Sequence, residues 1–194
     1  MEPLPVIIGV TGASGAALAK RCIELLVKQE RPVIAVCSTA GQMTWQYELG
    51  GSFRQWLTTT PARFFNIRDV AAPIASGSFP TAGMAIVPCS MNTLAAVAHG
   101  LSANLLERAA DVTMKESRPL VIAPRESPLS VIHLTNLLTL ARLGVRIVPP
   151  MPPFYARPAS VDEVIDHIAG RILVALGVLA ALPSDQQYGN GLPR

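Results

Sequence analysis

The sequence predicts a doubly wound α/β fold, in which a Rossmann-like parallel sheet is flanked by helices on both faces. Short apolar runs of strand length alternate along the chain with longer segments of helical periodicity. The runs are apolar at nearly every position, as strands are when both faces of a parallel sheet are covered. A glycine-rich turn also follows the first run, at the place where doubly wound folds bind ligands.

The first part of the chain supplies two strands, each followed by a helix. Residues 5–10 form a β-type apolar run, the turn at 11–15 follows, and residues 16–28 place apolar side chains at helical spacing. Residues 32–37 form the second apolar run, and a helix is expected over 40–48. Because parallel strands need long crossovers, this alternation favours a parallel sheet.

Residues 50–78 interrupt the alternation. They are rich in Thr, Pro, Ala and Ser, and the segment Ala75-Ser76-Gly77-Ser78 has loop composition. We interpret residues 50–78 as an irregular excursion that carries function.

The rest of the chain continues the pattern and ends in a helix. Further apolar runs predict strands at 83–88, 119–123 and 145–148. The segments between them predict helices over 93–99, 104–116 and 129–143. Ser160-Val161-Asp162-Glu163 has the spacing of a capping box, so a terminal helix should begin there. The length of 194 residues suits one domain, which we assign to residues 1–183, followed by a tail over 184–194.

The composition favours an oligomer of a cytoplasmic protein. Half of the residues are hydrophobic and only 15% are charged, so much apolar surface must lie in the core or against other subunits. The apolar run 172–182 is shorter than the roughly 20 residues of a membrane span and predicts a buried helix. The first ten residues lack the pattern of a secretory signal, so we do not expect secretion. The net charge of +3 comes from scattered basic residues, which does not indicate nucleic-acid binding.

The three cysteines predict buried, reduced thiols. Cys22, Cys37 and Cys89 are odd in number, widely spaced and surrounded by apolar residues. Neither a disulfide framework nor a zinc site has this pattern, and we expect no metal.

Polar residues directly after the strands are the candidate binding groups, since ligands of such sheets bind beyond the carboxyl ends of the strands. Gly12 and Ser14 lie in the first turn, where a hydroxyl and free amides of a helix N-terminus can receive an anion. Ser38 follows the second strand, and Ser90 and Thr93 follow the strand at 83–88. Each of these residues also fits a purely structural role as a tight turn or a helix cap.

A mononucleotide fits this pattern better than NAD. None of the tyrosines Tyr47, Tyr155 and Tyr188 has a lysine four positions later, as a short-chain dehydrogenase requires. No acidic residue ends the second strand to hold an adenosine ribose, whereas Ser38 suits a phosphate.

Taken together, a set of segments resembles the UbiX/Pad family of flavin prenyltransferases in order and spacing over almost the whole chain. They are Gly9-Val10-Thr11-Gly12-Ala13-Ser14-Gly15, Ala75-Ser76-Gly77-Ser78, Pro88-Cys89-Ser90-Met91-Asn92-Thr93-Leu94, Arg108-Ala109-Ala110-Asp111-Val112, Lys115-Glu116, Pro124-Arg125-Glu126, Phe154-Tyr155 and Arg171. The resemblance implies transfer of a dimethylallyl group from dimethylallyl monophosphate to reduced FMN. The product, an FMN with a fourth ring, would serve a partner decarboxylase of the UbiD type.

The resemblance also implies roles for individual residues. The FMN-binding positions would be Gly12, Ala13, Ser14, Ser38, Ser90, Met91, Asn92, Thr93 and Arg125. The dimethylallyl phosphate site would contain Tyr155 and Arg171 with Lys115, Glu126 and Arg108. Glu48 matches an acid that handles protons together with Ser14, and the released phosphate is an alternative proton acceptor. The family also implies a homo-oligomer, with a dodecamer as one candidate, and an active site near a subunit interface.

Two aromatic positions of the family differ in this chain. Tyr188 stands where relatives often have a tryptophan near the C-terminus, and Val70 stands where some have one before the Ala-Ser-Gly-Ser segment. The prenyl chain length is therefore left open. The chain has no Asp-Asp-x-x-Asp cluster for magnesium diphosphate, which favours a monophosphate donor held by Arg and Lys.

Two other functions are considered. One is an FMN-dependent decarboxylase of a cysteinyl substrate, which would use a histidine such as His133. The other is a flavin carrier or decarboxylase subunit, for which Lys115, Tyr155 and Arg171 would have no purpose.

Overall fold

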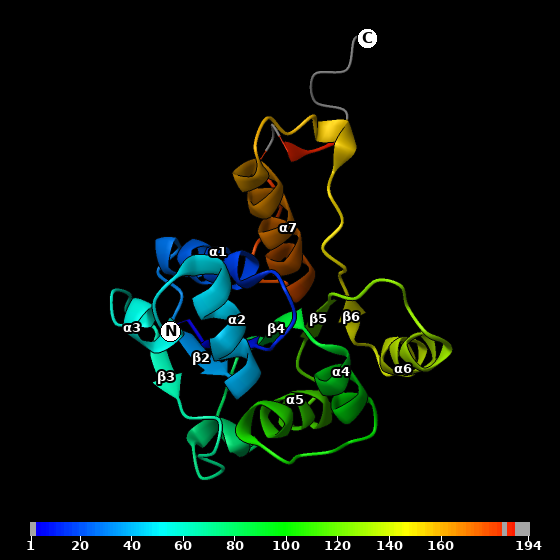
Figure 1. Ribbon diagram of the computed structural model, residues 1–194. Coiled ribbons are helices and arrows are strands. Elements are labelled where there is room, and N and C mark those ends of the chain that lie inside the picture. Colours follow the sequence, from blue (N-terminus) through cyan, green and yellow to red (C-terminus); the bar gives the residue numbers. More distant parts are fainter. Residues whose placement is uncertain (1–2, 184–185, 189–194) are drawn as a thin grey trace.

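Six parallel strands form the sheet that organises the chain, in the order β3-β2-β1-β4-β5-β6 (Figure 1). The computed structural model describes residues 3–183 and 186–188. The strands are β1 (Val6–Val10), β2 (Val33–Cys37), β3 (Arg63–Phe65), β4 (Gly83–Cys89), β5 (Leu120–Pro124) and β6 (Arg146–Ile147). The strand order reverses between β1 and β4, which confirms the predicted doubly wound fold.

Helices cover both faces of the sheet. They are α1 (Ala16–Lys28), α2 (Thr39–Leu49), α3 (Phe53–Leu57), α4 (Met91–Ala98), α5 (Leu105–Lys115), α6 (Val131–Arg142) and α7 (Val161–Leu176), with short 3₁₀ turns η1 (Pro73–Ala75) and η2 (Phe154–Ala156). Figure 1 shows α1 and α7 on one side of the sheet and α4, α5 and α6 on the other.

The alternation of side chains along β1 separates two hydrophobic cores. Ile8 points to the core that contains α1 and α7, and Ile7 points to the core that contains α4 and α5. Successive strand residues face opposite sides of a sheet, so a strand between two covered faces must be apolar throughout. All five residues of β1 are buried, as are all five of β2 and of β5.

Two expectations about secondary structure were wrong. Residues 50–78 contain α3, β3 and η1 rather than only irregular chain. The run 172–182 is not one helix, because α7 ends at Leu176 and Gly177 takes the left-handed conformation (φ 81°) that stops a helix. The start of α7 agrees with the prediction: Ser160 Oγ accepts from the Glu163 amide (3.2 Å), while the Glu163 carboxylate accepts from the Ala159 amide (2.8 Å).

The residues at 184–185 and 189–194 of the predicted tail lie outside the described residues. Within the described part, no helix combines the length and the apolar character needed to cross a membrane.

The three cysteines should be unreactive in the folded protein. All three thiols are buried, and burial raises the pKa of Cys22 and Cys37 to about 12 and also raises the pKa of Cys89. Because the thiolate is the reactive form, a disulfide reagent at about pH 8 should modify the native protein very slowly. Absorbance of the released thiol should show three reactive groups only after denaturant is added. Rapid modification of the native protein would contradict this.

Candidate functional site

Hydrogen bonds connect the carboxyl ends of β1, β4 and β5 at the edge where a ligand is expected. Thr11 Oγ1 donates to the Pro88 carbonyl (2.7 Å) and accepts from the Ser90 amide (2.8 Å). The Arg125 amide donates to the Cys89 carbonyl (3.1 Å). Thr11 is 1% exposed and its organising role was missed; its signal is a hydroxyl directly after an apolar strand.

The turn after β1 approaches the start of α2 closely. A Cβ at Gly12 would lie 2.5 Å from the Ala40 Cβ, so only glycine fits there without movement. Gly15 has φ +118°, in the left-handed region that glycine favours. The small residues of this turn are therefore explained by tight turning.

Ser38 and Ser90 both cap helices. Ser38 Oγ accepts from the Gly41 amide (2.9 Å) at the start of α2. Ser90 Oγ accepts from the Thr93 amide (3.4 Å) and donates to Thr93 Oγ1 (3.2 Å) at the start of α4. A capping serine uses its oxygen as the acceptor, so the Ser38 hydroxyl proton remains available to an anion. The structure therefore makes capping and anion binding compatible.

Among the remaining residues expected around FMN, Ala13 and Thr93 are buried at this edge of the sheet. Ser14, Asn92 and Arg125 are exposed. Met91 is partly buried and packs against the core on the α4 side of the sheet.

Glu48 is held on the N-terminus of α1. Its carboxylate accepts from the Gly15 amide (3.0 and 3.1 Å) and from the Ala16 amide (2.7 Å). Glycine at the N-cap offers no side chain, and an acid there also complements the helix dipole. The Glu48 carboxylate therefore binds the amide of the residue that follows Ser14, and these backbone bonds give it a structural role that the sequence did not indicate.

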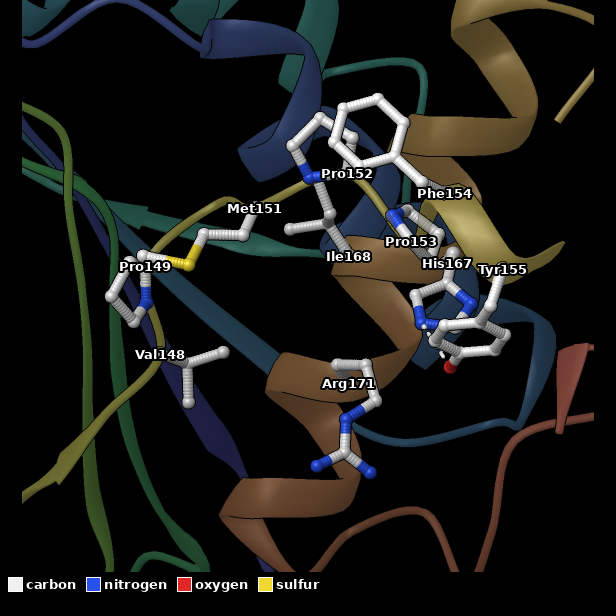
Figure 2. A pocket seen from close by; sticks show the side chains of 10 residues that line it. All are labelled: Val148, Pro149, Met151, Pro152, Pro153, Phe154, Tyr155, His167, Ile168 and Arg171. Atoms are coloured by element: carbon white, nitrogen blue, oxygen red, sulfur yellow. Dashed lines mark hydrogen bonds between the residues drawn. The ribbon is translucent and has the colours of Figure 1, made fainter. Parts of the chain in front are cut away.

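Tyr155 and Arg171 line a cavity of about 450 Å³ (Figure 2). Val148, which follows β6, lines the cavity, and its amide still donates to the Ile122 carbonyl of β5 (2.9 Å). The cavity therefore begins where the chain leaves the sheet after β6. Its apolar walls are Val148, Pro149, Met151, Pro152, Pro153, Phe154 and Ile168. The Tyr188 ring packs edge-on against the Tyr155 ring with centroids 5.3 Å apart, whereas Val70 is 59% exposed and lines no part of the cavity.

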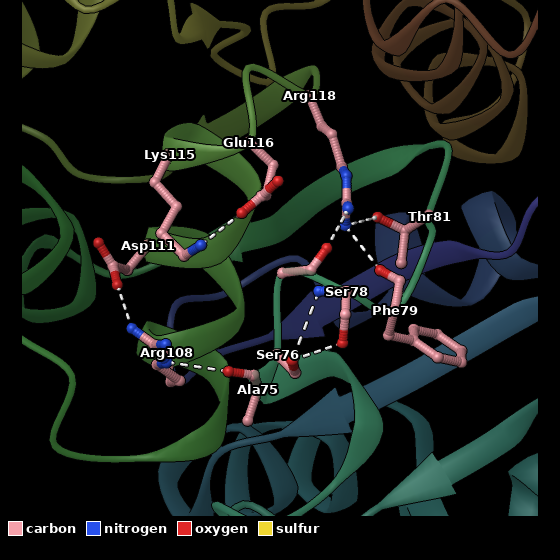
Figure 3. A network of polar contacts seen from close by, with 11 residues as sticks. Ala75, Ser76, Ser78, Phe79, Thr81, Arg108, Asp111, Lys115, Glu116 and Arg118 are labelled. Atoms are coloured by element: carbon pink, nitrogen blue, oxygen red, sulfur yellow. Dashed lines mark hydrogen bonds and ion pairs between the residues drawn. The ribbon is translucent and has the colours of Figure 1, made fainter.

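Arg108 and Lys115 lie on α5, and both side chains are bonded to neighbouring residues of the same chain (Figure 3). Arg108 donates to the Ala75 carbonyl (3.0 Å) and pairs with Asp111 (2.6 Å). Lys115 pairs with Glu116, and this bond lowers the pKa of the Glu116 carboxyl. Arg118 donates to the Phe79 carbonyl (2.8 Å), so it binds the same segment of chain as Arg108 does through Ala75.

A single copy of the chain does not bring all the expected phosphate ligands together. Arg108 and Lys115 lie on α5, which packs on the opposite face of the sheet from α7, where Arg171 lies. Glu126 is exposed in the loop after β5, where it accepts from the Ser127 amide (3.0 Å). Tyr155 and Arg171 are the two expected ligands that share the cavity.

His133 has a structural role at the start of α6. Its Nδ1 accepts from the Ser130 amide (3.2 Å), and its own amide donates to Ser130 Oγ (3.2 Å). This reciprocal cap accounts for the presence of a histidine at position 133 without a role in redox chemistry.

Comparisons with known proteins agree on one family. The flavoprotein family matches residues 1–173. The flavin prenyltransferase UbiX of Synechocystis sp. is 43% identical over 189 residues, covering 90% of this chain and 91% of that protein. The crystal structure of AnUbiX (PadA1) in complex with FMN and dimethylallyl pyrophosphate is 37% identical and has a TM-score of 0.92 over 99% of this chain and 100% of that one. The dodecameric FMN-dependent UbiX-like decarboxylase from Escherichia coli O157:H7 is 42% identical and has a TM-score of 0.87, over 93% of this chain and 96% of that one.

Proposed function

This chain belongs to the flavoprotein family and to its UbiX flavin prenyltransferases, and we propose that it transfers a dimethylallyl group from dimethylallyl monophosphate to N5 and C6 of reduced FMN. The observation that carries the proposal is the pairing of two sites on one scaffold. One is a polar edge at the ends of β1, β2 and β4, and the other is an apolar cavity with a phenol and a guanidinium at β6 and α7.

FMN fits the polar edge. The turn at Gly12 leaves no room for a side chain, and the helices α2 and α4 begin at this edge, whereas the first amides of α1, at Gly15 and Ala16, are bound to Glu48. Helix N-termini and serine hydroxyls are suitable donors to a phosphate. We assign Gly12, Ala13, Ser14, Ser38, Ser90, Met91, Asn92, Thr93 and Arg125 to FMN binding. Reduced FMN, when bound there, supplies the ring atoms that receive the prenyl group.

The cavity suits the prenyl donor. A dimethylallyl chain is apolar and fits walls such as Met151 and Phe154, while its phosphate can bind the guanidinium of Arg171 and the hydroxyl of Tyr155. A cation fixed at the departing phosphate stabilises the charge that develops as the carbon–oxygen bond breaks. The apolar walls exclude water from the allylic cation. Ser14 lies just before the start of α1, and the Glu48 carboxylate reaches that helix start from the end of α2; we assign both residues to proton handling.

The product would pass to a UbiD-type decarboxylase, as the family implies. The cysteinyl decarboxylase alternative loses its named candidate, His133, because that residue caps α6. A flavin carrier would not need the cavity beside Arg171.

FMN, and not NAD(P), should bind the purified protein. Calorimetry with each nucleotide should show FMN binding at the edge formed by the turn at Gly12 and the capping serines. Ser38→Ala should weaken FMN binding by roughly tenfold, since one hydrogen bond to a charged phosphate is lost. Ser52→Ala is a matched control, because Ser52 also caps a short helix, at Gln55, away from this edge. Strong NAD(P) binding without FMN binding would overturn the proposal.

The complete donor site should require two copies of the chain. Arg108 and Lys115 lie on the face opposite α7, and α6 exposes an apolar surface that includes Val131 (79% exposed) and Ile132 (70%). Light scattering should therefore show a homo-oligomer. At limiting donor, reassembling Lys115→Ala with Arg171→Ala should give more activity than either variant alone, because some sites then receive both native residues from different copies. A monomer, or mixtures no more active than either variant although subunits exchange, would show that each site belongs to one copy.

A further inference from the structure

His167 occupies the wall of the donor cavity between Tyr155 and Arg171 and is 5% exposed (Figure 2). Its Nε2 lies 3.5 Å from the Tyr155 hydroxyl, and the two rings pack edge to face with centroids 5.9 Å apart. Its Nδ1 is buried and has no hydrogen-bond partner in the described part of the chain. A buried polar atom of this kind needs an explanation.

The unpartnered Nδ1 distinguishes the possible forms of the imidazole. With the proton on Nδ1, a buried N–H would have no acceptor, whereas the large majority of buried side-chain polar atoms in native structures have a partner. With both nitrogens protonated, the ring would carry that same N–H and a charge close to Arg171. Burial and then Arg171 lower the pKa of His167, which disfavours the charged form. The remaining form is neutral and carries its proton on Nε2.

A proton on Nε2 fixes the direction of the bond to Tyr155. The imidazole N–H donates to the phenolic oxygen, and that oxygen cannot then use its own hydrogen toward His167. The hydroxyl hydrogen is then free to point into the cavity that Tyr155 lines. Arg171 follows His167 by four residues on α7, so both side chains lie on the same side of that helix.

We propose that His167 is a positioning residue for the prenyl donor: its Nε2–H holds the Tyr155 hydroxyl so that the phenol donates to the phosphate bound at Arg171. The proposal rests on the proposed function, because it needs a phosphate in this cavity. It makes His167 act on the donor only through Tyr155. The sequence signal for His167 is its position four residues before Arg171, which places both residues on one side of a helix.

A double-mutant cycle on FMN-loaded protein tests this inference. His167→Leu should weaken binding of dimethylallyl monophosphate by roughly three- to tenfold, the usual range for one lost hydrogen bond. Tyr155→Phe should weaken it at least as much. His167→Leu in the Tyr155→Phe background should have no further effect, since the group through which it acts is already gone. His167→Gln should retain donor binding, because the amide can still donate to the phenolic oxygen.

The outcomes separate a failure of the His167 role from a failure of the proposed function. Equal losses from His167→Leu in both backgrounds, or no loss at all, would overturn the role of His167 while leaving the proposed function intact. If wild-type protein binds FMN but not dimethylallyl monophosphate, the donor assignment fails and this inference fails with it. FMN affinity and melting temperature should match wild type in every variant compared. Should His167→Leu not fold, nitrogen chemical shifts of the wild-type imidazole decide the matter, since a proton on Nδ1 would overturn the proposal.

Discussion

Replacing Glu48 with glutamine should leave FMN and donor binding intact and slow closure of the new ring by about 10²–10⁴-fold, the usual contribution of a positioned general base. Closing the ring requires the removal of a proton, which a carboxylate can accept and an amide cannot. The glutamine oxygen can still accept from the amides of Gly15 and Ala16, so the start of α1 should keep its shape. Single-turnover absorbance under anaerobic conditions should show a reaction that stalls between its two bond-forming steps.

The structural role of Glu48 calls for a matched control. Glu163 is also a carboxylate that accepts from a backbone amide at the start of a helix, that of Ala159 at α7. Glu163→Gln should therefore reproduce any loss of capping without slowing ring closure. If Glu48→Gln closes the ring at the wild-type rate, Glu48 is only a helix cap, and the proton leaves by another route, such as to the released phosphate.

Arg171→Ala should weaken binding of dimethylallyl monophosphate by roughly 10- to 100-fold, because it removes a charge-assisted hydrogen bond present before any chemistry. Arg171 lies in the cavity wall and not at the strand ends, so FMN affinity should not change. Calorimetry on the FMN-loaded protein measures both quantities. The defect then differs from that of Glu48→Gln, which binds the donor and fails later.

Arg142→Ala is the control for the lost charge, since Arg142 is exposed at the end of α6 and lines no part of the cavity. It should bind the donor as wild type does. Unchanged donor affinity in Arg171→Ala would remove Arg171 from the phosphate site.

The long elements could be predicted from sequence because their patterns are local. Residues 16–28 were expected to be helical and form α1 with those bounds, and the apolar runs at β1, β2, β4 and β5 were recognised. The segments α3 and β3 were missed because they have only five and three residues. They depend on tertiary packing, such as the Phe53 ring against Trp45 with centroids 4.7 Å apart. The local pattern of apolar residues does not indicate that contact.

The residues of the candidate site could be named from the sequence, but the contacts between them could not be predicted. Residues after the strands could be named because parallel strands end at one edge. Glu48 reaches α1 from the end of α2, and nothing in the spacing of 33 residues between Gly15 and Glu48 indicates that they meet. The location of Lys115 and Arg171 on opposite faces likewise follows from which face each helix covers, a choice that the sequence pattern leaves open.

The most direct test of the account is one turnover with the proposed donor. FMN-loaded protein is reduced without oxygen, mixed with dimethylallyl monophosphate, reoxidised and extracted for mass spectrometry of the flavin. The extracted FMN should carry one added dimethylallyl unit and have an altered absorbance spectrum, and Arg171→Ala should give far less of this modified flavin at limiting donor. Recovery of only unmodified FMN from wild-type protein that binds both ligands would contradict it.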